Sequence, residues 1–370
     1  MERIKKIGID CRMIKESGIG RYIENLITNL NNIDKTNHYY LFLSDLNSIE
    51  VALSENFTLV EANFTWHGLQ EQFQFLKLIN SYNLDLFHSP HPNMPYLYNK
   101  PFIITIHDLT MLKQKTGRAS TYSYPIYFLK WLVFKIMISI AVRRAKKVIT
   151  VSNFVKDQIV HEFKLPDSKV EVIYNGVSDS VKLITNSKQI DSVKNKFGLT
   201  KPFLFYVGNA YPHKNLEKLI LAFELLNQNG DLILFLGGKE DFFYERLKSD
   251  YGNLKNIIFG GYLTDEEISA LYTSCEAFVY PSISEGFGIQ IIEALKIGSK
   301  VICSNNSSFP EIAGKYAFYF NPFDVEDINK TLKISLKLPN KNHRENLLKY
   351  LEKFDWKKSA LLHYELYQKN

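Results

Sequence analysis

Cysteine is scarce in this chain of 370 residues, which holds three cysteines at distant positions. An odd number without C-x-x-C spacing supports neither a disulfide framework nor a cysteine-based metal site, so we expect a reducing compartment. Long apolar runs are also lacking. The most apolar segment, residues 131–142, contains Lys135 and is much shorter than the roughly twenty residues of a membrane span. We therefore expect no transmembrane helix.

Metal-binding patterns are absent as well. No two aspartates stand at D-x-D spacing, and the histidines lack zinc-like spacing with cysteines or acidic residues, so we expect no required metal and no cofactor. The net charge of +6, from 45 Lys and Arg against 39 Asp and Glu, favours acidic ligands but is too modest and too evenly spread to predict nucleic-acid binding. Residues 1–6 lead into an alternating strand rather than an apolar signal core, so we expect a cytoplasmic protein.

The order of elements predicts an α/β fold. Short apolar runs alternate with longer segments of helical period, which is typical of parallel sheets joined by crossover helices. A polar stretch, Ser178 to Gly198, lacks a strong strand and predicts the boundary between two doubly wound units. The expected strands are residues 6–10, 39–44, 85–89, 102–107, 147–152 and 170–174 in the first unit, and 203–207, 232–236, 256–259, 277–280 and 300–303 in the second.

A glycine pair follows the first expected strand. Gly18 and Gly20 precede apolar residues at helical spacing, and a helix that opens on glycines exposes backbone N–H groups and a favourable dipole to an anion. The match to the dinucleotide fingerprint is poor, because its third glycine would fall at Ile23. A tight turn without a ligand stays open as the alternative.

A lysine stands at the corresponding place in the second unit. Lys214 and Asn215 follow the strand 203–207 and open an amphipathic helix. A lysine at a helix start faces an unfavourable dipole, so a bound phosphate explains it better than solvent does. An exposed loop lysine is the alternative.

Two glutamates form the third candidate. Glu285 lies in a glycine-rich turn after the strand 277–280, and Glu293 lies on the following helix. If all eight steps between them were helical, the separation would be about 12 Å, which suits gripping of an extended ligand better than paired acid–base hydrolysis. A surface glutamate favoured by the helix dipole is the alternative for Glu285.

The run from Glu285 to Ile289, with Glu293 eight positions on, resembles the E-x7-E motif of the family-four (group 1) retaining glycosyltransferases, which have the GT-B fold. The segment from Pro212 to Leu216 resembles bacterial mannosyltransferase-like members. Further matches, in the family's order between about residues 4 and 325, are Ser17 to Tyr22, Ile106 to Leu109, Thr150 to Ser152, Asn175-Gly176, Lys214-Asn215, Gly261-Tyr262 and Phe309 to Gly314.

The resemblance implies two Rossmann-like domains facing a deep cleft. Residues 1–177 would bind the acceptor, residues 178–355 the nucleoside-diphosphate sugar, and a helix over 356–370 would cross back to the first domain. Glu285 and His107 would act on the donor sugar as the catalytic pair, while Lys214 would hold the diphosphate and Glu293 the ribose. The other donor-binding residues would be Gly18, Gly20, Arg21, Asn209, His213, Tyr262, Gly286, Phe287, Gly288 and Ile289.

Three positions depart from the family's pattern. Asn209 and His213 stand where relatives often carry arginines, so we expect the diphosphate charge to be met less strongly, or by Arg21 and backbone N–H groups instead. Gln290 replaces the usual proline, a change that we expect to matter little.

The function implied is transfer of a hexose to a polysaccharide or lipid-linked glycan acceptor in bacterial surface polysaccharide biosynthesis. We favour mannose from GDP-mannose, with UDP-sugars open. Two alternatives remain: a nucleotide-sugar epimerase of the same fold, which needs no acceptor, and a non-catalytic nucleotide-sugar-binding subunit, against which the retention of Glu285, Glu293, Lys214 and His107 argues.

The segment 124–147 has two interpretations. It combines aromatic and aliphatic residues with six Lys and Arg residues, so it is a candidate for peripheral docking on the inner face of an anionic cytoplasmic membrane. A buried helix with a basic exit into the next strand is the alternative.

Overall fold

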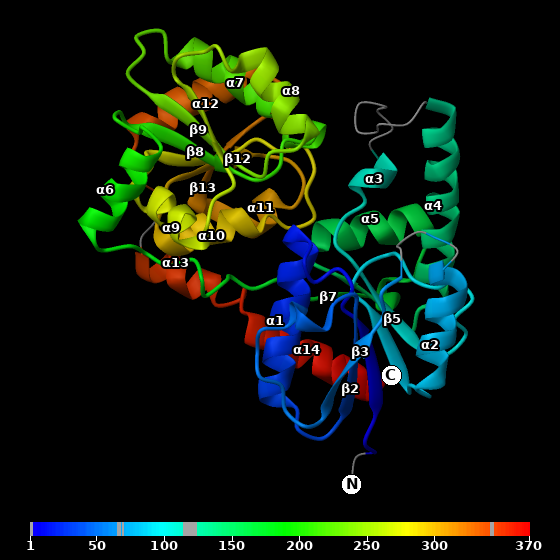
Figure 1. The fold of residues 1–370 in the computed structure, drawn as a ribbon. Helices are drawn as coiled ribbons and strands as arrows, with labels where there is room; N and C mark the ends of the chain where they lie inside the picture. Colours follow the sequence, from blue (N-terminus) through cyan, green and yellow to red (C-terminus); the bar gives the residue numbers. More distant parts are fainter. Residues whose placement is uncertain (1–2, 65–67, 69, 114–123, 341–343) are drawn as a thin grey trace. The chain divides into compact units, whose positions relative to one another are not determined.

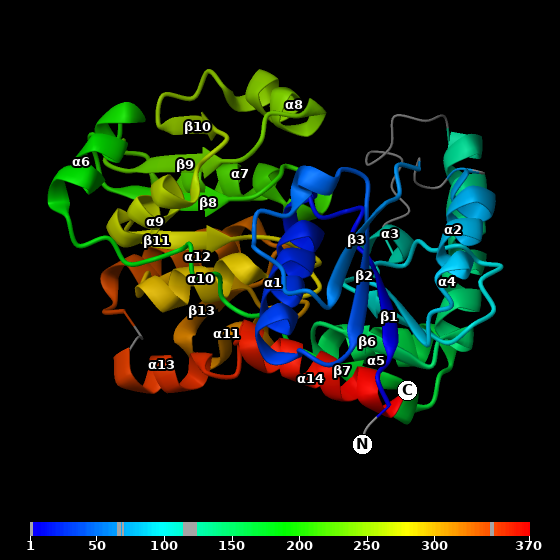
Figure 2. The ribbon, with the colours of Figure 1, turned by 60° about the horizontal axis from the view of Figure 1, so that its bottom comes forward.

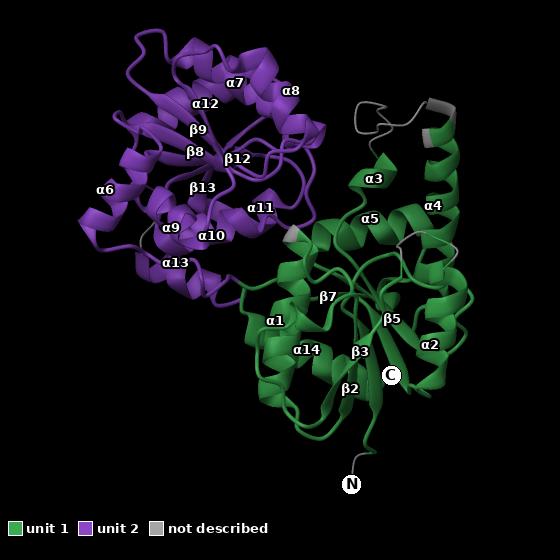
Figure 3. Cartoon of the chain, viewed as in Figure 1, with its two compact units in different colours: residues 1–176, 354–370 green, residues 177–353 purple. Residues whose placement is uncertain are grey.

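The chain divides into two compact units (Figure 3). The computed structural model describes residues 3–370 except 65–67, 69, 114–123 and 341–343. Unit 1 comprises Met1–Gly176 and Phe354–Asn370, and unit 2 comprises Val177–Lys353. In this described part of the chain each unit has one parallel sheet with helices on both faces, so the predicted pair of doubly wound α/β units is confirmed.

Unit 1 contains a sheet of order β3-β2-β1-β4-β5-β6-β7, in which every neighbouring pair is parallel. The strands are β1 (Lys6–Asp10), β2 (His38–Leu43), β3 (Phe57–Glu61), β4 (Leu86–Ser89), β5 (Phe102–Ile106), β6 (Lys147–Thr150) and β7 (Val170–Val172). The helices are α1 (Ser17–Ile33), α2 (Leu76–Ser81), α3 (Thr110–Lys113), α4 (Tyr124–Arg144), α5 (Asn153–Phe163) and α14 (Trp356–Lys369).

Two apolar cores cover the two faces of this sheet. Helices α1 and α14 lie side by side on one face (Figures 1 and 2), where Tyr22 and Leu26 of α1 pack with Tyr367 of α14. On the other face, Phe75, Ile138 of α4 and Ile159 of α5 share a second core. The Lys5 ammonium donates to the carbonyls of Tyr367 and Gln368, at 2.9 and 2.8 Å, so α14 is tied to the start of the chain.

Unit 2 contains a sheet of order β10-β9-β8-β11-β12-β13, again parallel throughout. The strands are β8 (Phe203–Val207), β9 (Ile233–Gly237), β10 (Ile257–Gly261), β11 (Ala277–Tyr280), β12 (Val301–Ser304) and β13 (Ala317–Phe320). The helices are α6 (Ser187–Lys196), α7 (Leu216–Leu226), α8 (Phe242–Tyr251), α9 (Asp265–Ser274), α10 (Ile289–Ile297), α11 (Phe309–Ala313), α12 (Val325–Lys337) and α13 (Arg344–Leu351).

The helices of unit 2 also divide between the faces of its sheet. Helices α7 and α12 pack together on one face, and α9 packs with α6 and α10 on the other (Figure 1). In the residues that the structure describes, no helix combines the length and the apolar character needed to cross a membrane.

Candidate functional site

The strand order of unit 2 defines where a ligand would bind. Strands β8 and β11 are neighbours, and the chain continues outward from β8 to β9 and from β11 to β12. Loops that leave the carboxyl ends of such strands diverge to opposite faces, which opens a crevice at the switch point of an open α/β sheet. The loop after β8 carries Lys214, and the loop after β11 carries Glu285.

Lys214 and Glu285 form an ion pair at this switch point. The Lys214 ammonium donates to Oε1 of Glu285, and the side chains are only 8% and 16% exposed. Lys214 ends a short 3-10 helix, Pro212–Lys214, and Asn215 then takes a left-handed backbone conformation with φ of 60°. The lysine is therefore held in a turn and buried, which excludes the exposed loop lysine considered from the sequence.

The ion pair keeps Glu285 ionised. Burial alone raises the pKa of its carboxyl, but the charges of Lys214 and His213 outweigh burial and leave the pKa below its ordinary value. Glu285 is therefore a carboxylate at neutral pH, able to accept hydrogen bonds from the hydroxyls of a sugar.

The backbone around Glu285 is fixed by two serines. The N–H of Glu285 donates to Oγ of Ser307 at 2.8 Å, and the Ser308 hydroxyl donates to the carbonyl of Phe287 at 3.0 Å. Gly288, with φ of 91°, ends the turn as the residue before α10. A Cβ at Gly288 would lie 3.1 Å from the ring of Phe309, so both the backbone angle and the space favour glycine there.

Glu293 lies within helix α10, whereas Glu285 lies in the turn before that helix. It is the fifth residue of α10 and is 2% exposed. Because α10 begins only at Ile289, half of the path from Glu285 to Glu293 is not helical, so the condition under which the separation was calculated is not met.

The remaining predicted donor-binding residues of unit 2 follow β8, β10 and β11. The amide oxygen Oδ1 of Asn209 is buried and has no hydrogen-bond partner among the described residues. Tyr262 follows β10 and is 75% exposed, while Phe287 is buried. The His213 carbonyl accepts the N–H of Ile283 at 2.7 Å, so the loops after β8 and β11 are joined directly.

The glycine pair of unit 1 lies at the start of a helix, as the sequence predicts. Gly18 and Gly20 both belong to the first turn of α1. The N–H of Gly20 donates to the carbonyl of Glu16 at 2.7 Å, and a Cβ there would lie 2.2 Å from the carbonyl oxygen of Ile14. The N–H of Gly20 is thus already used by the helix, and close packing against the Ile14 carbonyl is enough to explain a glycine at this position.

His107 follows directly after β5, as expected. Its Nε2–H donates to the carbonyl of Pro90 at 2.8 Å, and its ring meets Tyr22 edge-on at a centroid distance of 4.8 Å. Burial lowers the pKa of His107 to about 4, so the ring is neutral at pH 7. With the proton on Nε2, the nitrogen Nδ1 is a hydrogen-bond acceptor.

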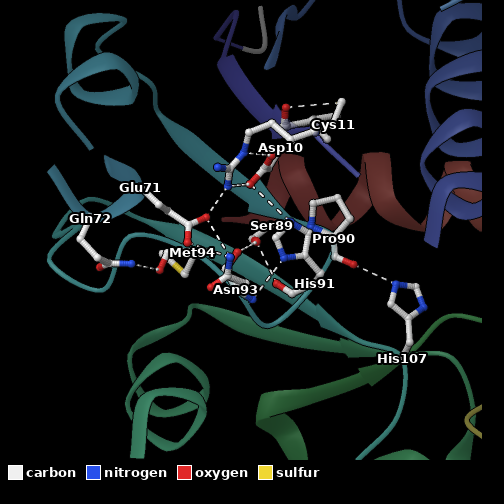
Figure 4. Close-up of polar contacts among 12 residues, drawn as sticks. Asp10, Cys11, Glu71, Gln72, Ser89, Pro90, His91, Asn93, Met94 and His107 are labelled. Atoms are coloured by element: carbon white, nitrogen blue, oxygen red, sulfur yellow. Dashed lines mark hydrogen bonds and ion pairs between the residues drawn. The ribbon is translucent and has the colours of Figure 1, made fainter. Parts of the chain in front are cut away.

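A buried charged cluster, which the sequence analysis missed, lies at the switch point of the unit 1 sheet. It joins Asp10, the last residue of β1, and Arg12, just after that strand, with Glu71 and the loop after β4 (Figure 4). Arg12 donates to both oxygens of Asp10, at 2.9 and 2.7 Å, and to Oε1 of Glu71 at 2.6 Å. Both ion pairs are fully buried. The appearance of Asp10 and Arg12 at the end of an apolar strand was the signal that could have revealed them.

The loop after β4 connects this cluster to His107. Asn93 donates its amide to both oxygens of Glu71, at 2.9 and 2.8 Å, and its N–H to Nδ1 of His91 at 3.1 Å (Figure 4). Nε2 of His91 lies 3.4 Å from Oδ2 of Asp10. The same short loop contributes the Pro90 carbonyl that accepts from His107, so the cluster fixes the partner of that histidine.

The predicted residues therefore fall into two groups. Gly18, Gly20, Arg21 and His107 belong to unit 1, and all the others belong to unit 2, where the loops bring Lys214 and Glu285 into contact. Among the described residues, no three His, Cys, Asp or Glu side chains gather in a way that could hold a metal ion.

Comparison with known families agrees with this architecture. The family described as "Glycosyl transferases group 1" matches residues 187–354, and "Glycosyltransferase Family 4" matches residues 17–181. The chain belongs to the family-four (group 1) glycosyltransferases and has the GT-B fold.

Individual relatives include proteins named as mannosyltransferases. The chain is 29% identical over 293 residues to the O-antigen chain mannosyltransferase RfbU of Salmonella typhimurium, covering 79% of this chain and 75% of that protein. It is 31% identical over 230 residues to the serotype-specific mannosyltransferase WbdA of Escherichia coli, covering 59% of this chain. The match spans only 28% of the length of WbdA.

Solved structures share the fold at low identity. Sucrose-phosphate synthase from Thermosynechococcus elongatus superposes with a TM-score of 0.75 at 18% identity, covering 99% of this chain and 98% of that one. Anabaena HepE in complex with UDP and glucose gives 0.73 at 16% identity, covering 98% and 99%.

Proposed function

We propose that this protein is a retaining hexosyltransferase that takes a sugar from a nucleoside diphosphate and transfers it to a glycan or lipid-linked acceptor. The observation that carries the proposal is the partly buried Lys214–Glu285 ion pair at the switch point of unit 2. Unit 2 would bind the donor, and unit 1 would bind the acceptor.

The chemistry suits these side chains. As a sugar leaves a diphosphate, positive charge develops at the sugar and negative charge grows on the phosphate. The Lys214 ammonium is suited to stabilise the phosphate, and the Glu285 carboxylate is suited to hold the sugar hydroxyls. Glu293 would hold the ribose. Nδ1 of His107 would accept a hydrogen bond from a hydroxyl, because the Nε2–H already donates to the Pro90 carbonyl.

GDP-mannose is the donor that we favour. The relatives RfbU and WbdA are named mannosyltransferases, and the segment from Pro212 to Leu216 resembles such members. We further propose that the acceptor belongs to bacterial surface polysaccharide biosynthesis on the cytoplasmic side of the membrane.

A transfer assay tests the proposal. Purified protein is incubated with GDP-mannose or UDP-glucose and with polyprenyl-diphosphate-linked glycans, and the product anomer is read by NMR. We expect a glycosylated acceptor that keeps the anomeric configuration of the donor, and loss of product with Glu285→Gln. Interconversion of sugar nucleotides without an acceptor would indicate an epimerase, and donor binding without turnover would indicate a binding subunit. Either result would contradict the proposal.

The exposed face of α4 supports peripheral membrane docking. Five apolar residues at helical spacing are between 40% and 62% exposed: Leu129, Leu132, Val133, Ile136 and Ile140. The opposite side of the helix, with Ile138, Ala141 and Val142, is buried in the core of unit 1. The buried-helix interpretation therefore covers only one side of α4, and a contiguous apolar stripe of this kind is typical of an interaction surface.

The positive charge of α4 favours an anionic membrane as the partner that binds its exposed face. Helix α4 contains Lys130, Lys135, Arg143 and Arg144 and no acidic residue. Positive charges beside exposed apolar residues are attracted to anionic headgroups. We propose that α4 lies along the membrane surface, where lipid-linked acceptors are found.

Vesicle sedimentation tests the docking surface. The wild type should pellet with phosphatidylcholine vesicles that contain phosphatidylglycerol, and less with phosphatidylcholine alone. Leu132→Ser with Ile136→Ser should abolish pelleting. The matched control is Leu221→Ser with Leu225→Ser on α7, where both leucines are similarly exposed. Equal binding by the two double variants, or a dimer that dissociates only in the α4 variant, would contradict membrane docking.

A further inference from the structure

Tyr280 places its hydroxyl beside the Lys214–Glu285 pair. It is the last residue of β11 and is fully buried. Its oxygen lies 3.3 Å from Nζ of Lys214, which donates to it, and 3.3 Å from Oε1 of Glu285. A third partner is the side-chain oxygen Oε1 of Gln290, at 3.2 Å. One hydroxyl therefore contacts both proposed donor-binding side chains and one further residue.

The Tyr280 hydroxyl has one proton for two acceptors. Burial, followed by the charge of Glu285, raises the pKa of Tyr280 well above its ordinary value, so the hydroxyl stays protonated at neutral pH. A phenol donates a single hydrogen bond, and neither a carboxylate nor an amide oxygen can donate in return. Glu285 and Gln290 consequently compete for the same proton.

Gln290 is held where it can accept that proton. It is the second residue of α10, and its backbone carbonyl accepts the hydroxyl of Tyr272 at 3.2 Å. The proline usual at this position in the family has no side-chain acceptor, so the expectation that its replacement matters little overlooks this contact.

We infer that Tyr280 and Gln290 are positioning residues for Glu285, with Gln290 taking the Tyr280 hydrogen bond when the carboxylate turns to the donor sugar. The inference rests on the proposed function. Without a donor, Glu285 accepts from Lys214 and is within reach of Tyr280. When phosphate engages Lys214 and sugar hydroxyls engage Glu285, the Tyr280 proton rests on Gln290, and Oε1 of Glu285 becomes available to the sugar.

The inference predicts an effect on sugar recognition but not on nucleotide recognition. In Gln290→Met the chain keeps a side chain of similar length without a strong acceptor, so Tyr280 stays bonded to Glu285. Because one neutral hydrogen bond is redirected, we expect affinity for the sugar-bearing nucleotide to fall about three- to tenfold. The free nucleoside diphosphate has no sugar to contact Glu285, so the affinity for it should not change.

Calorimetry with two ligand pairs tests this. GDP-mannose and GDP, and UDP-glucose and UDP, are titrated into wild type, Gln290→Met, Tyr280→Phe and the double variant. Once Tyr280→Phe has removed the shared proton, Gln290→Met should cause no further loss, which a double-mutant cycle detects. Gln189→Met on α6 is the matched control.

The outcomes separate this inference from the proposed function. One set of results requires that the wild type binds both members of a ligand pair. If Gln290→Met then leaves the preference for the sugar-bearing nucleotide unchanged, or if the effects of Gln290→Met and Tyr280→Phe are additive, the positioning role alone is overturned. Absence of wild-type binding to both pairs would overturn the proposed function and this inference with it.

Discussion

Lys214 and Glu285, which are predicted to bind the phosphate and the sugar of one donor, form a partly buried ion pair with each other. The pair neutralises two charges that would otherwise be costly to bury without a ligand. Binding of a donor would exchange this contact for one contact at each end of the phosphate–sugar bond. Both side chains are therefore already in contact at the switch point of unit 2.

Acid should remove the contribution of this pair to stability. The pKa of Glu285 is lower in the folded state, so its stabilisation is present above its ordinary pKa of about 4.5 and is lost as the pH falls through the folded value. The difference in unfolding temperature between wild type and Glu285→Gln should therefore shrink between pH 6 and pH 3.5. A difference that stays constant over this range would contradict the ion pair.

Three histidines with lowered pKa values give unit 1 a different pH dependence. Burial lowers the pKa of His107 and of His363 to about 4, and that of His88 also falls well below its ordinary value of 6.5. The unfolded chain then binds protons that the folded chain does not, so unit 1 should lose stability as the pH falls from 6.5 towards 4.

Substitution of one histidine tests that slope. His363→Gln should lower the pH dependence of the unfolding free energy between pH 4.5 and 6.5 by up to one proton, about 1.4 kcal/mol per pH unit. Urea unfolding at several pH values measures this. His161→Gln, at an exposed position of α5, is the control and should leave the slope unchanged. Equal slopes in all three proteins would show that His363 titrates normally in the folded state.

Removal of the cation from the buried charged cluster of unit 1 should lower the free energy of unfolding far more than removal of the cation from a surface ion pair. Arg12→Met leaves the carboxylates of Asp10 and Glu71 buried without their cation, so we expect a loss of about 3 to 5 kcal/mol in the free energy of unfolding. Lys15→Met breaks the exposed pair with Asp45, whose side chains are 66% and 44% exposed. That change should cost no more than about 1 kcal/mol.

A triple variant separates charge from packing in this cluster. Arg12→Met combined with Asp10→Asn and Glu71→Gln leaves no unpaired charge and should recover part of the lost stability. If Arg12→Met destabilises the chain no more than Lys15→Met does, the cluster is not the charged core of unit 1.

The sequence predicted the central strands well but missed one strand in each sheet. β3 and β13 both lie at a sheet edge. In β3, buried Phe57 and Val60 alternate with exposed residues such as Leu59, so no continuous apolar run marks the strand. Central strands such as β5 are buried throughout, which gives the uninterrupted apolar run of a parallel sheet.

The sequence could predict those site residues that lie at or just after the end of a strand. Lys214 and Glu285 lie in the loop after a predicted strand, and His107 is the last residue of one. Contacts made by residues distant in sequence, such as Arg12 with Glu71, depend on how the loops fold and leave no local pattern. Gly20 shows why a glycine pattern is ambiguous. A glycine that is required by close approach to the Ile14 carbonyl looks the same in the sequence as a glycine that approaches a phosphate.

Calorimetric titration of GDP, UDP, dTDP and ADP and of their sugar conjugates, in the presence of EDTA, tests the central claim most directly. We predict saturable binding of one nucleotide class without magnesium. Lys214→Ala should weaken it by roughly 1.5 to 3 kcal/mol, the range for a hydrogen bond to a charged group. Lys255→Ala, an exposed lysine before β10, should bind like wild type. Unchanged affinity in Lys214→Ala, or no binding of any nucleotide to the wild type, would contradict a donor site at the Lys214–Glu285 pair.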